Sequence, residues 1–322
     1  MTEKKLISLV IPVFNEADNL DRLFALVDEA LKSLTDRYDF EFVFTDNHST
    51  DATFAVLAAR AASDKRIRVI RFSRNFGYQK SILTGYMNAR GSAAVQLDAD
   101  LQDPPALIAE FIALWEQGNA VVYGVRRARP EGWLLHTTRR FFYRIVSFLS
   151  DHELPLNAGD FRLIDRRILD LLATIADQNP YIRGIIPTLG FKQVGVVYDR
   201  NARISGKSKF SLAQYVALAS DAIVSQSIMP LRIATYAGLL IAVVTMVGIM
   251  IAVVGQMIFG AEWPPGWATV TVLILFGISL NALFLGIIGE YLGRMYRQSI
   301  SRPITIVERT IPEEVRTAAR RE

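Results

Sequence analysis

The 322-residue sequence contains no cysteine and only three histidines. Without cysteine the chain can form no disulfide bond, which agrees with a reducing compartment such as the cytoplasm. The histidines, His48, His136 and His152, lack the spacing of a metal site and are interpreted as ordinary polar residues. The patterns G-x-G-x-x-G and G-x-x-x-x-G-K-[ST] are also absent, so neither dinucleotide nor P-loop chemistry is indicated.

Charge is missing from two long stretches toward the C-terminus. Residues 233–260 and 263–289 carry no charged side chain, and Glu262 lies between them. Each stretch exceeds the roughly 20 residues that a helix needs to cross a bilayer. We therefore predict two transmembrane helices, at about 233–258 and 267–290, joined by a short turn whose two tryptophans suit a membrane interface. Buried core helices are the alternative, but they are rarely uncharged over such a length.

Basic residues flank the two expected spans and are absent from the turn between them. The flanking basic residues are Arg203, Lys207, Lys209, Arg232, Arg294, Arg297 and Arg302. By the positive-inside rule, both termini and the domain before the spans are expected in the cytoplasm, in a multi-pass protein of the plasma membrane or bacterial inner membrane. The net charge of +4 fits an anionic lipid or a phosphate-bearing substrate. Nucleic acid is disfavoured, because the basic residues cluster beside the spans.

The first 125 residues alternate between short strands rich in Val, Ile and Phe and helical stretches. Strands are expected at LISLVIPV, FEFVFT, IRVIRF, AAVQL and AVVYG, with helices near 17–34, 51–62, 78–89 and 104–117. This order predicts an α/β fold with a mostly parallel, Rossmann-like sheet flanked by helices. Polar segments follow the first four strands, and in such sheets ligands bind beyond the carboxyl ends of the strands.

The sequence QLDADLQDPP places Asp98, Asp100 and Asp103 directly after the fourth expected strand. Helix capping explains part of it, since Asp103 is expected as the N-cap and Pro104 as the first helical residue. Capping does not explain Asp98 and Asp100, because neighbouring carboxylates repel each other unless a cation or hydrogen-bond donors hold them. We predict that Asp98, Asp100 and the amide oxygen of Gln102 bind Mg²⁺ or Mn²⁺.

Six motifs, taken in order, resemble the family 2 glycosyltransferases with a GT-A fold. The motifs are P-x-F-N-E (12–16), D-N-x-S-T-D (46–51), R-N-F-G (74–77), D-A-D-L-Q-D-P (98–104), G-D-F-R-L-x-D-R (159–166) and R-x-x-G-x-S-K (203–209). The sequence is most similar to the polyprenyl-phosphate glycosyltransferases, the group that contains bactoprenol glucosyltransferase and dolichol-phosphate mannose synthase. The chain has Asn47 and His48 where the family often has aspartate and glycine.

The resemblance implies a nucleotide-sugar donor and a set of residues that bind the substrates. Acidic side chains near the nucleoside can accept hydrogen bonds from its base and ribose, and Arg and Lys can neutralise phosphate. The expected substrate-binding residues are Pro12, Phe14, Glu16, Asp46, Asp98, Ala99, Arg126, Arg203, Ser208 and Lys209.

Asp160, within NAGDFRLIDR, has two interpretations. It can cap a helix whose pattern begins at Leu163, or, as the resemblance implies, it is the catalytic carboxylate at the anomeric centre. In that role it would orient the acceptor or take its residual proton. Because a phosphate monoester with a second pKa near 6 is already mostly ionised at neutral pH, positioning is favoured over proton abstraction.

The expected organisation is a glycosyltransferase domain over 1–209, an interfacial amphipathic helix over 210–230, two spans within 231–293 and a cytoplasmic tail over 294–322. We predict inverting transfer of one sugar, from UDP-glucose in the first instance, to undecaprenyl or a related polyprenyl phosphate by a homo-oligomer such as a tetramer. GDP-mannose and UDP-aminoarabinose donors stay open. A processive polysaccharide synthase is disfavoured by the absence of any Arg-Trp pair, and a non-catalytic membrane scaffold would not need the acidic clusters.

Overall fold

The computed structural model of the chain describes two units, each treated by itself. One unit contains residues 1–136, 152–209 and 302–322, and the other contains 137–151 and 210–301. The described residues are 4–127, 158–175, 180–200, 231, 234–241, 243, 244, 247, 250, 254, 266–299 and 303–313.

The first unit is built on an eight-stranded sheet with the order β7-β5-β6-β4-β1-β2-β3-β8. Strands β4, β1, β2 and β3 run parallel, as do β5 and β7, whereas β6 and β8 are antiparallel to their neighbours. The predicted mostly parallel sheet is therefore confirmed. The strands are β1 (Lys5–Val13), β2 (Tyr38–Asp46), β3 (Ile67–Phe72), β4 (Ala93–Gln96), β5 (Val121–Arg126), β6 (Ala158–Asp165), β7 (Gln193–Tyr198) and β8 (Val307–Ile311).

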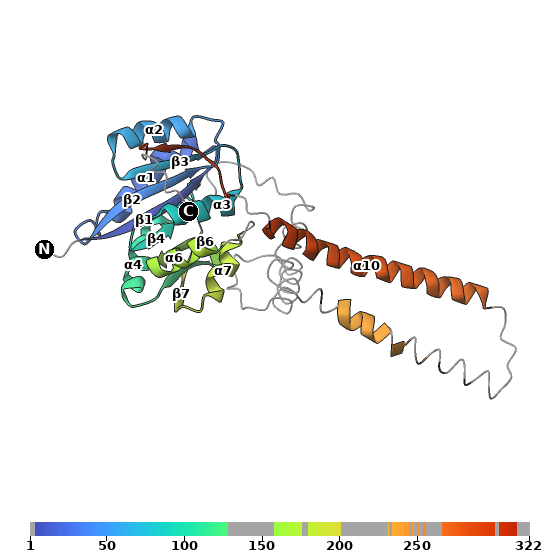
Figure 1. Cartoon of the computed structure of the whole chain (residues 1–322). Helices are drawn as coiled ribbons and strands as arrows, with labels where there is room; N and C mark the ends of the chain where they lie inside the picture. The colour runs from blue at the N-terminus through green and yellow to red at the C-terminus, as the bar shows by residue number, and fades with distance from the viewer. Residues whose placement is uncertain are drawn as a thin grey trace, which may run out of the picture. The chain divides into compact units, whose positions relative to one another are not determined.

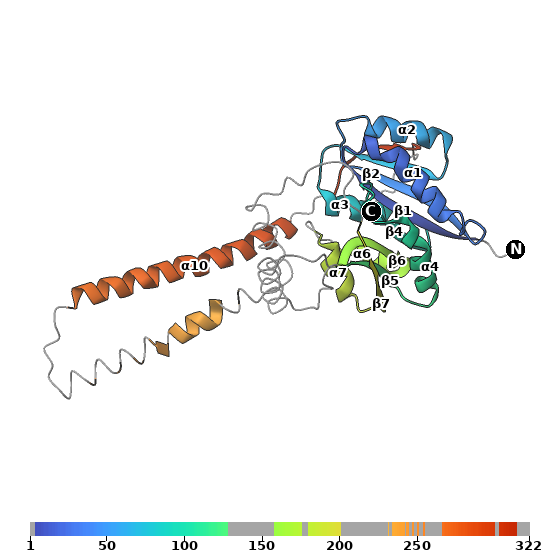
Figure 2. The same cartoon turned by 180° about the vertical axis from the view of Figure 1, so that it is seen from behind.

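Helices cover both faces of this sheet (Figures 1 and 2). One face packs against α1 (Ala17–Leu31), α2 (Thr53–Ser63) and α4 (Ile108–Glu116), which follows the short 3₁₀ helix η1 (Pro105–Leu107). The other packs against α3 (Tyr78–Asn88), α6 (Arg166–Thr174) and α7 (Ile182–Thr188). The helices predicted in the first 125 residues are found, with ends shifted by up to four residues.

Strand β1 shows why the sequence folds as a central strand. Ile7, Leu9 and Ile11 pack into the core on one side of the sheet, and Val10 packs into the core on the other. Successive side chains of a strand point to opposite faces, so a strand covered by helices on both faces must be apolar throughout. The run LISLVIPV meets this requirement and is almost fully buried.

Three strands, β6, β7 and β8, were not predicted. Strand β6 carries Asp160, where the pattern was interpreted as the beginning of a helix at Leu163; the helix begins instead at Arg166, with Asp165 as its N-cap. Strand β8 lies in the segment predicted as a cytoplasmic tail and pairs with β3, Ile70 opposite Thr310.

In the second unit, α10 (Trp267–Ser299) covers the second expected span in a 33-residue helix, drawn in orange-red in Figure 1. Most of the first expected span and the whole expected interfacial helix lie outside the described residues. Within the described ranges, no helix combines the length and the apolar character that crossing a bilayer requires.

Candidate functional site

The carboxyl ends of β1 and β2 are tied together by their loops. The Asn15 side-chain oxygen accepts a hydrogen bond from the Thr50 amide at 2.8 Å, and the Asn15 amide donates to Ser49 Oγ at 3.0 Å. Asn15 has a φ of 55°, a left-handed conformation that asparagine tolerates better than most residues. This geometry fixes the loop that carries two predicted nucleoside-binding residues, Phe14 and Glu16. Phe14 is 44% exposed, and the Glu16 carboxylate accepts from Asn19 at 2.6 Å.

Asp46, at the end of β2, is completely buried. One of its oxygens accepts a hydrogen bond from the Ser49 amide at 2.9 Å, and the other lies 3.4 Å from Arg71 and makes no hydrogen bond. The Arg71 guanidinium stacks over Phe54, 4.4 Å from the ring centre, and also lies 3.4 Å from Glu308 of β8. A buried carboxylate oxygen without a hydrogen bond can still accept one, which suits the imide or amino group of a base. Pro12 lies next to this site in β1, opposite Thr45.

Asn47 and His48, where the chain departs from the family pattern, have local roles. The Asn47 side-chain oxygen accepts a hydrogen bond from the Phe76 amide at 2.8 Å, which joins the β2 end to the R-N-F-G segment. His48 has a φ of 64°, and its Nδ1 lies 3.0 Å from the Phe72 carbonyl oxygen.

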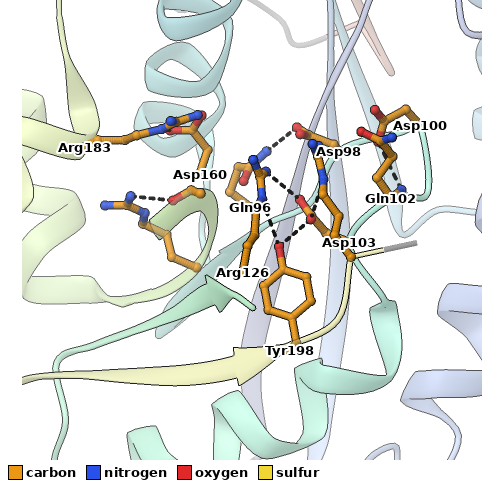
Figure 3. A network of polar contacts seen from close by, with 12 residues as sticks. Gln96, Asp98, Asp100, Gln102, Asp103, Arg126, Asp160, Arg183 and Tyr198 are labelled. Atoms are coloured by element: carbon orange, nitrogen blue, oxygen red, sulfur yellow. Dashed lines mark hydrogen bonds and ion pairs between the residues drawn. The ribbon is translucent and has the colours of Figure 1, made fainter. Parts of the chain in front are cut away.

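The predicted metal ligands lie along the turn that follows β4 (Figure 3). Asp98 Oδ1 accepts hydrogen bonds from the hydroxyl of Tyr78 and from Gln96 Nε2 at 2.7 Å, and Asp100 Oδ1 accepts from the amide of Gln102 at 3.2 Å. Burial raises the pKa of Asp98 to about 7; the Tyr78 bond opposes this rise, and the charges of Asp103, Asp160 and Asp100 add to it. Ala99, between the two carboxylates, is buried.

These residues suit a divalent cation. Asp98 lies among three further carboxylates, and Gln96 contributes a buried Oε1 that has no hydrogen-bond partner. Hard oxygen donors in a concentration of negative charge are what Mg²⁺ and Mn²⁺ prefer. Within the described residues, no group of three or more His, Cys, Asp or Glu is placed to hold a metal, so a site here needs the amide oxygen of Gln102 or water as well.

Asp103 does not cap a helix, so this prediction was wrong. The 3₁₀ helix has Pro104 as its N-cap, with no side-chain cap, and Asp103 turns into the interior. It accepts a hydrogen bond from the hydroxyl of Tyr198 at 2.5 Å and lies 3.6 Å from Arg126 and 3.4 Å from Arg200. The reason is electrostatic: cations and a hydroxyl from the ends of β5 and β7 hold the buried charge. No motif signals this contact, because Tyr198 and Arg200 are almost 100 residues from Asp103 along the chain.

Arg126, predicted to neutralise phosphate, is held in place by the chain around it. Its Nε donates to the Tyr198 hydroxyl at 3.4 Å, and its guanidinium passes over Gly159. A Cβ atom at position 159 would lie 2.9 Å from Arg126 Nη2, so this close approach requires glycine.

Asp160 is in strand β6 and caps no helix, which excludes the capping interpretation. Its carboxylate is 3% exposed and receives a two-point contact from Arg183 of α7, with Nε 2.9 Å from Oδ1 and Nη2 2.5 Å from Oδ2 (Figure 3). Burial opposes ionisation, but Arg183, Arg162 and Gln79 outweigh it and lower the pKa of Asp160. Sequence reasoning missed Arg183, because a single arginine in the apolar segment YIRGIIP carries no motif.

The structure thus brings together most of the predicted residues at one edge of the sheet. Arg203, Ser208 and Lys209 lie outside the described residues. The predicted residues that lie at this edge are Pro12, Phe14, Glu16, Asp46, Asp98, Ala99, Asp100, Gln102, Arg126 and Asp160.

Comparison with known proteins identifies the class to which this architecture belongs. Residues 8–172 match the family model for glycosyl transferase family 2. The chain belongs to this family and is a glycosyltransferase.

Relatives match over nearly the full chain. An uncharacterized glycosyltransferase YkcC of Bacillus subtilis is 37% identical over 94% of this chain and 93% of its own length. A prophage bactoprenol glucosyl transferase homolog of Escherichia coli is 35% identical, over 94% of this chain and 98% of its own. A bactoprenol glucosyl transferase of Shigella phage SfV is 33% identical over the same shares.

Proposed function

We propose that the protein transfers one glucose from UDP-glucose to a polyprenyl monophosphate such as undecaprenyl phosphate, with inversion at the anomeric carbon. The observation that carries the proposal is the acidic end of β4, where the charges of Asp100, Asp103 and Asp160 all act on Asp98. This site suits a diphosphate bound through a divalent metal. The relatives named bactoprenol glucosyl transferase support the choice of sugar and lipid.

The donor nucleoside would lie over the ends of β1 and β2. Phe14 offers an exposed ring for stacking, and the Asp46 oxygen that lies near Arg71 but makes no hydrogen bond can accept one from a base N–H group. Glu16 would accept from the ribose hydroxyl groups, while Pro12 and Ala99 would shape the floor of the site. This arrangement orients the sugar toward β4 and β6.

The metal would be held by Asp98, Asp100 and Gln102. When bound, Mg²⁺ or Mn²⁺ would offset the charge of the diphosphate leaving group. Arg126 would supply positive charge on the same side, with its guanidinium already held by Asp103 and Tyr198. Arg203, Ser208 and Lys209 are proposed to bind phosphate as well, on the basis of the family motif.

The acceptor needs little activation. A phosphate monoester with a second pKa near 6 is mostly a dianion at neutral pH and is already nucleophilic. Asp160, whose pKa is lowered, is a poor proton acceptor at that pH, so its proposed role is to position groups at the anomeric centre.

We further propose that residues 231–293 anchor the enzyme in the plasma or inner membrane, with the catalytic domain on the cytoplasmic side. The proposal rests on the two uncharged stretches and their basic flanks, and on the exposed apolar side chains of α10, among them Leu273, Phe276 and Leu285. An anchor is advantageous because the lipid acceptor stays in the bilayer.

A transfer assay tests the function directly. Purified full-length protein would be incubated with Mn²⁺, undecaprenyl phosphate and labelled UDP-glucose, GDP-mannose or a UDP-aminoarabinose, and the lipid products separated. We expect one sugar per lipid, with UDP-glucose the fastest donor. A polymeric product would indicate a processive synthase, and no lipid product with any donor would contradict the proposal. Light scattering of the same preparation tests the expected homo-oligomer.

A further inference from the structure

Arg183 joins a buried carboxylate to the accessible part of the site. Its Nε and Nη2 atoms donate to the two oxygens of Asp160, which is 3% exposed, whereas 36% of the Arg183 side chain is exposed. One edge of the guanidinium is therefore held by the buried carboxylate, while part of the Arg183 side chain stays accessible. If Arg183 served only to neutralise Asp160, its side chain would not need to be accessible.

The outward part of Arg183 has donors to spare. An arginine side chain carries five N–H groups, and the Asp160 contact uses the Nε and Nη2 edge. Toward the described residues, Nη1 of Arg183 donates no hydrogen bond. A guanidinium with one edge on a carboxylate can present its other edge to an oxyanion without losing side-chain freedom on binding, because it is already ordered.

The contacts around Asp160 keep this guanidinium in one orientation. Gln79 Nε2 lies 3.5 Å from both carboxylate oxygens, and the Gln79 side-chain oxygen accepts from the Ile182 amide at 3.2 Å. The start of α7, which carries Arg183, is thereby connected to Asp160 by two routes. Mutual stabilisation lowers the pKa of Asp160 and raises that of Arg183, so the pair stays charged.

Carboxylates lie near Arg183, so a phosphate can bind there only if a positive charge offsets theirs. Tyr78 lies within the electrostatic influence of Asp98, Asp160 and Arg183 together, and its hydroxyl donates to Asp98. A phosphate that entered this region would be repelled by both carboxylates. Arg183, together with Arg162, offsets the charge of Asp160 there.

We propose that the outward edge of Arg183 binds phosphate oxygens of a substrate, and that Asp160 is a positioning residue that holds the guanidinium for this purpose. The inference rests on the proposed glycosyl transfer, because that function supplies the phosphates. The chemistry is shared by the monophosphate of the lipid acceptor and the diphosphate of the donor. Asp160 then acts on the reaction through Arg183, in addition to any contact of its own with substrate.

Binding measurements separate the two phosphates. Calorimetry on full-length protein would use farnesyl monophosphate as the acceptor probe and UDP with Mn²⁺ as the donor probe. Charge-assisted hydrogen bonds contribute roughly 1.5–3 kcal/mol, so we expect Arg183→Gln to weaken farnesyl monophosphate about 10- to 100-fold and UDP by less than twofold. Arg60→Gln is the matched control, since Arg60 of α2 forms an ion pair with Asp21 of α1 outside the site, and its replacement should leave both affinities unchanged.

The Arg183→Lys variant distinguishes a loss of phosphate binding from a loss of folding. Lysine keeps the charge but cannot contact Asp160 and a phosphate with two edges at once, so we expect an intermediate loss of affinity. In turnover with UDP-glucose, the acceptor KM should rise while kcat changes much less. Asp160→Asn should raise the same KM, because the guanidinium is no longer held. A merely structural role would lower the melting temperature without this separation of KM from kcat.

Weaker UDP binding with unchanged farnesyl monophosphate binding would support the phosphate site and assign it to the donor. If folded Arg183→Gln or Arg183→Lys protein binds both probes as the wild type does, the inference is overturned while the proposed function stands. Wild-type protein that binds neither probe would overturn both.

Discussion

At the residue scale, Asp100 offers a test of the proposed metal site. Its carboxylate accepts a hydrogen bond from the Gln102 amide and lies in the turn after β4, outside the hydrophobic core, so Asp100→Ala should not affect the core. We expect the variant to fold, to lose Mn²⁺-dependent UDP binding and to lose turnover, because a proposed metal ligand is removed. Calorimetry with and without Mn²⁺ measures this. Asp36→Asn, an exposed substitution outside the site, is the control; turnover that persists in a chelator would contradict the prediction.

Gly159 gives a residue-scale test of Arg126. A methyl group at this position meets the flexible end of the Arg126 side chain at 2.9 Å, so the side chain can move away while the strand stays intact. We expect Gly159→Ala to change the melting temperature little and to reduce turnover by roughly tenfold, the loss of about one charge-assisted hydrogen bond. Turnover equal to wild type would show that Arg126 need not pass over this glycine.

At the element scale, Asp165 stabilises the start of α6. Its side chain accepts from the Arg167 amide at 3.0 Å and from Trp115 Nε1 at 2.7 Å. We expect Asp165→Ala to lower the free energy of unfolding by about 1–2 kcal/mol at pH 7, measured by urea denaturation. Asp170→Ala, on the exposed side of the same helix, should cost much less.

The contribution of Asp165 to the free energy of unfolding should also depend on pH. Burial would raise the pKa of Asp165, but the bonds from Arg167 and Trp115 outweigh it, so the net pKa is lowered on folding. A lowered folded-state pKa gives stability that is present above the unfolded value near 4 and is lost as the pH falls through the folded value. The difference between wild type and Asp165→Ala should therefore shrink between pH 5 and pH 3. A constant difference across this range would contradict the ionised role.

The elements that could be predicted from the sequence are those with a local signature. The parallel core was predictable because each of its strands is an apolar run followed by a helix. Strand β6 was not, since Asp160 and Arg162 are polar residues that a sequence pattern places at the surface or at a helix end, whereas both are buried, Asp160 through its contact with the distant Arg183. The pairing of Arg183 with Asp160 and of Asp103 with Tyr198 is likewise a product of tertiary structure, which motif spacing does not encode.

At the scale of the whole molecule, the anchor can be tested without damaging the sheet. Truncation after Lys209 removes β8 and exposes the edge of β3, which invites aggregation. Replacing residues 210–301 by a long flexible linker keeps β8. We expect this variant to be soluble and to bind UDP normally, but to use undecaprenyl phosphate in vesicles far more slowly, because the membrane no longer raises the local concentration. A rate on vesicles equal to that of the full-length protein would refute the anchor.

The pairing of β8 with β3 also determines when the sheet can be completed during synthesis. Strand β8 emerges from the ribosome only after α10, whereas its partner β3 is made more than 200 residues earlier. At 5–20 residues per second, β3 is an open edge for roughly 10–50 s of translation. The catalytic sheet can therefore reach its final form only when the entire second unit has been translated, so any ribosome that stalls within α10 leaves a domain that contains every described site residue but lacks its outer strand.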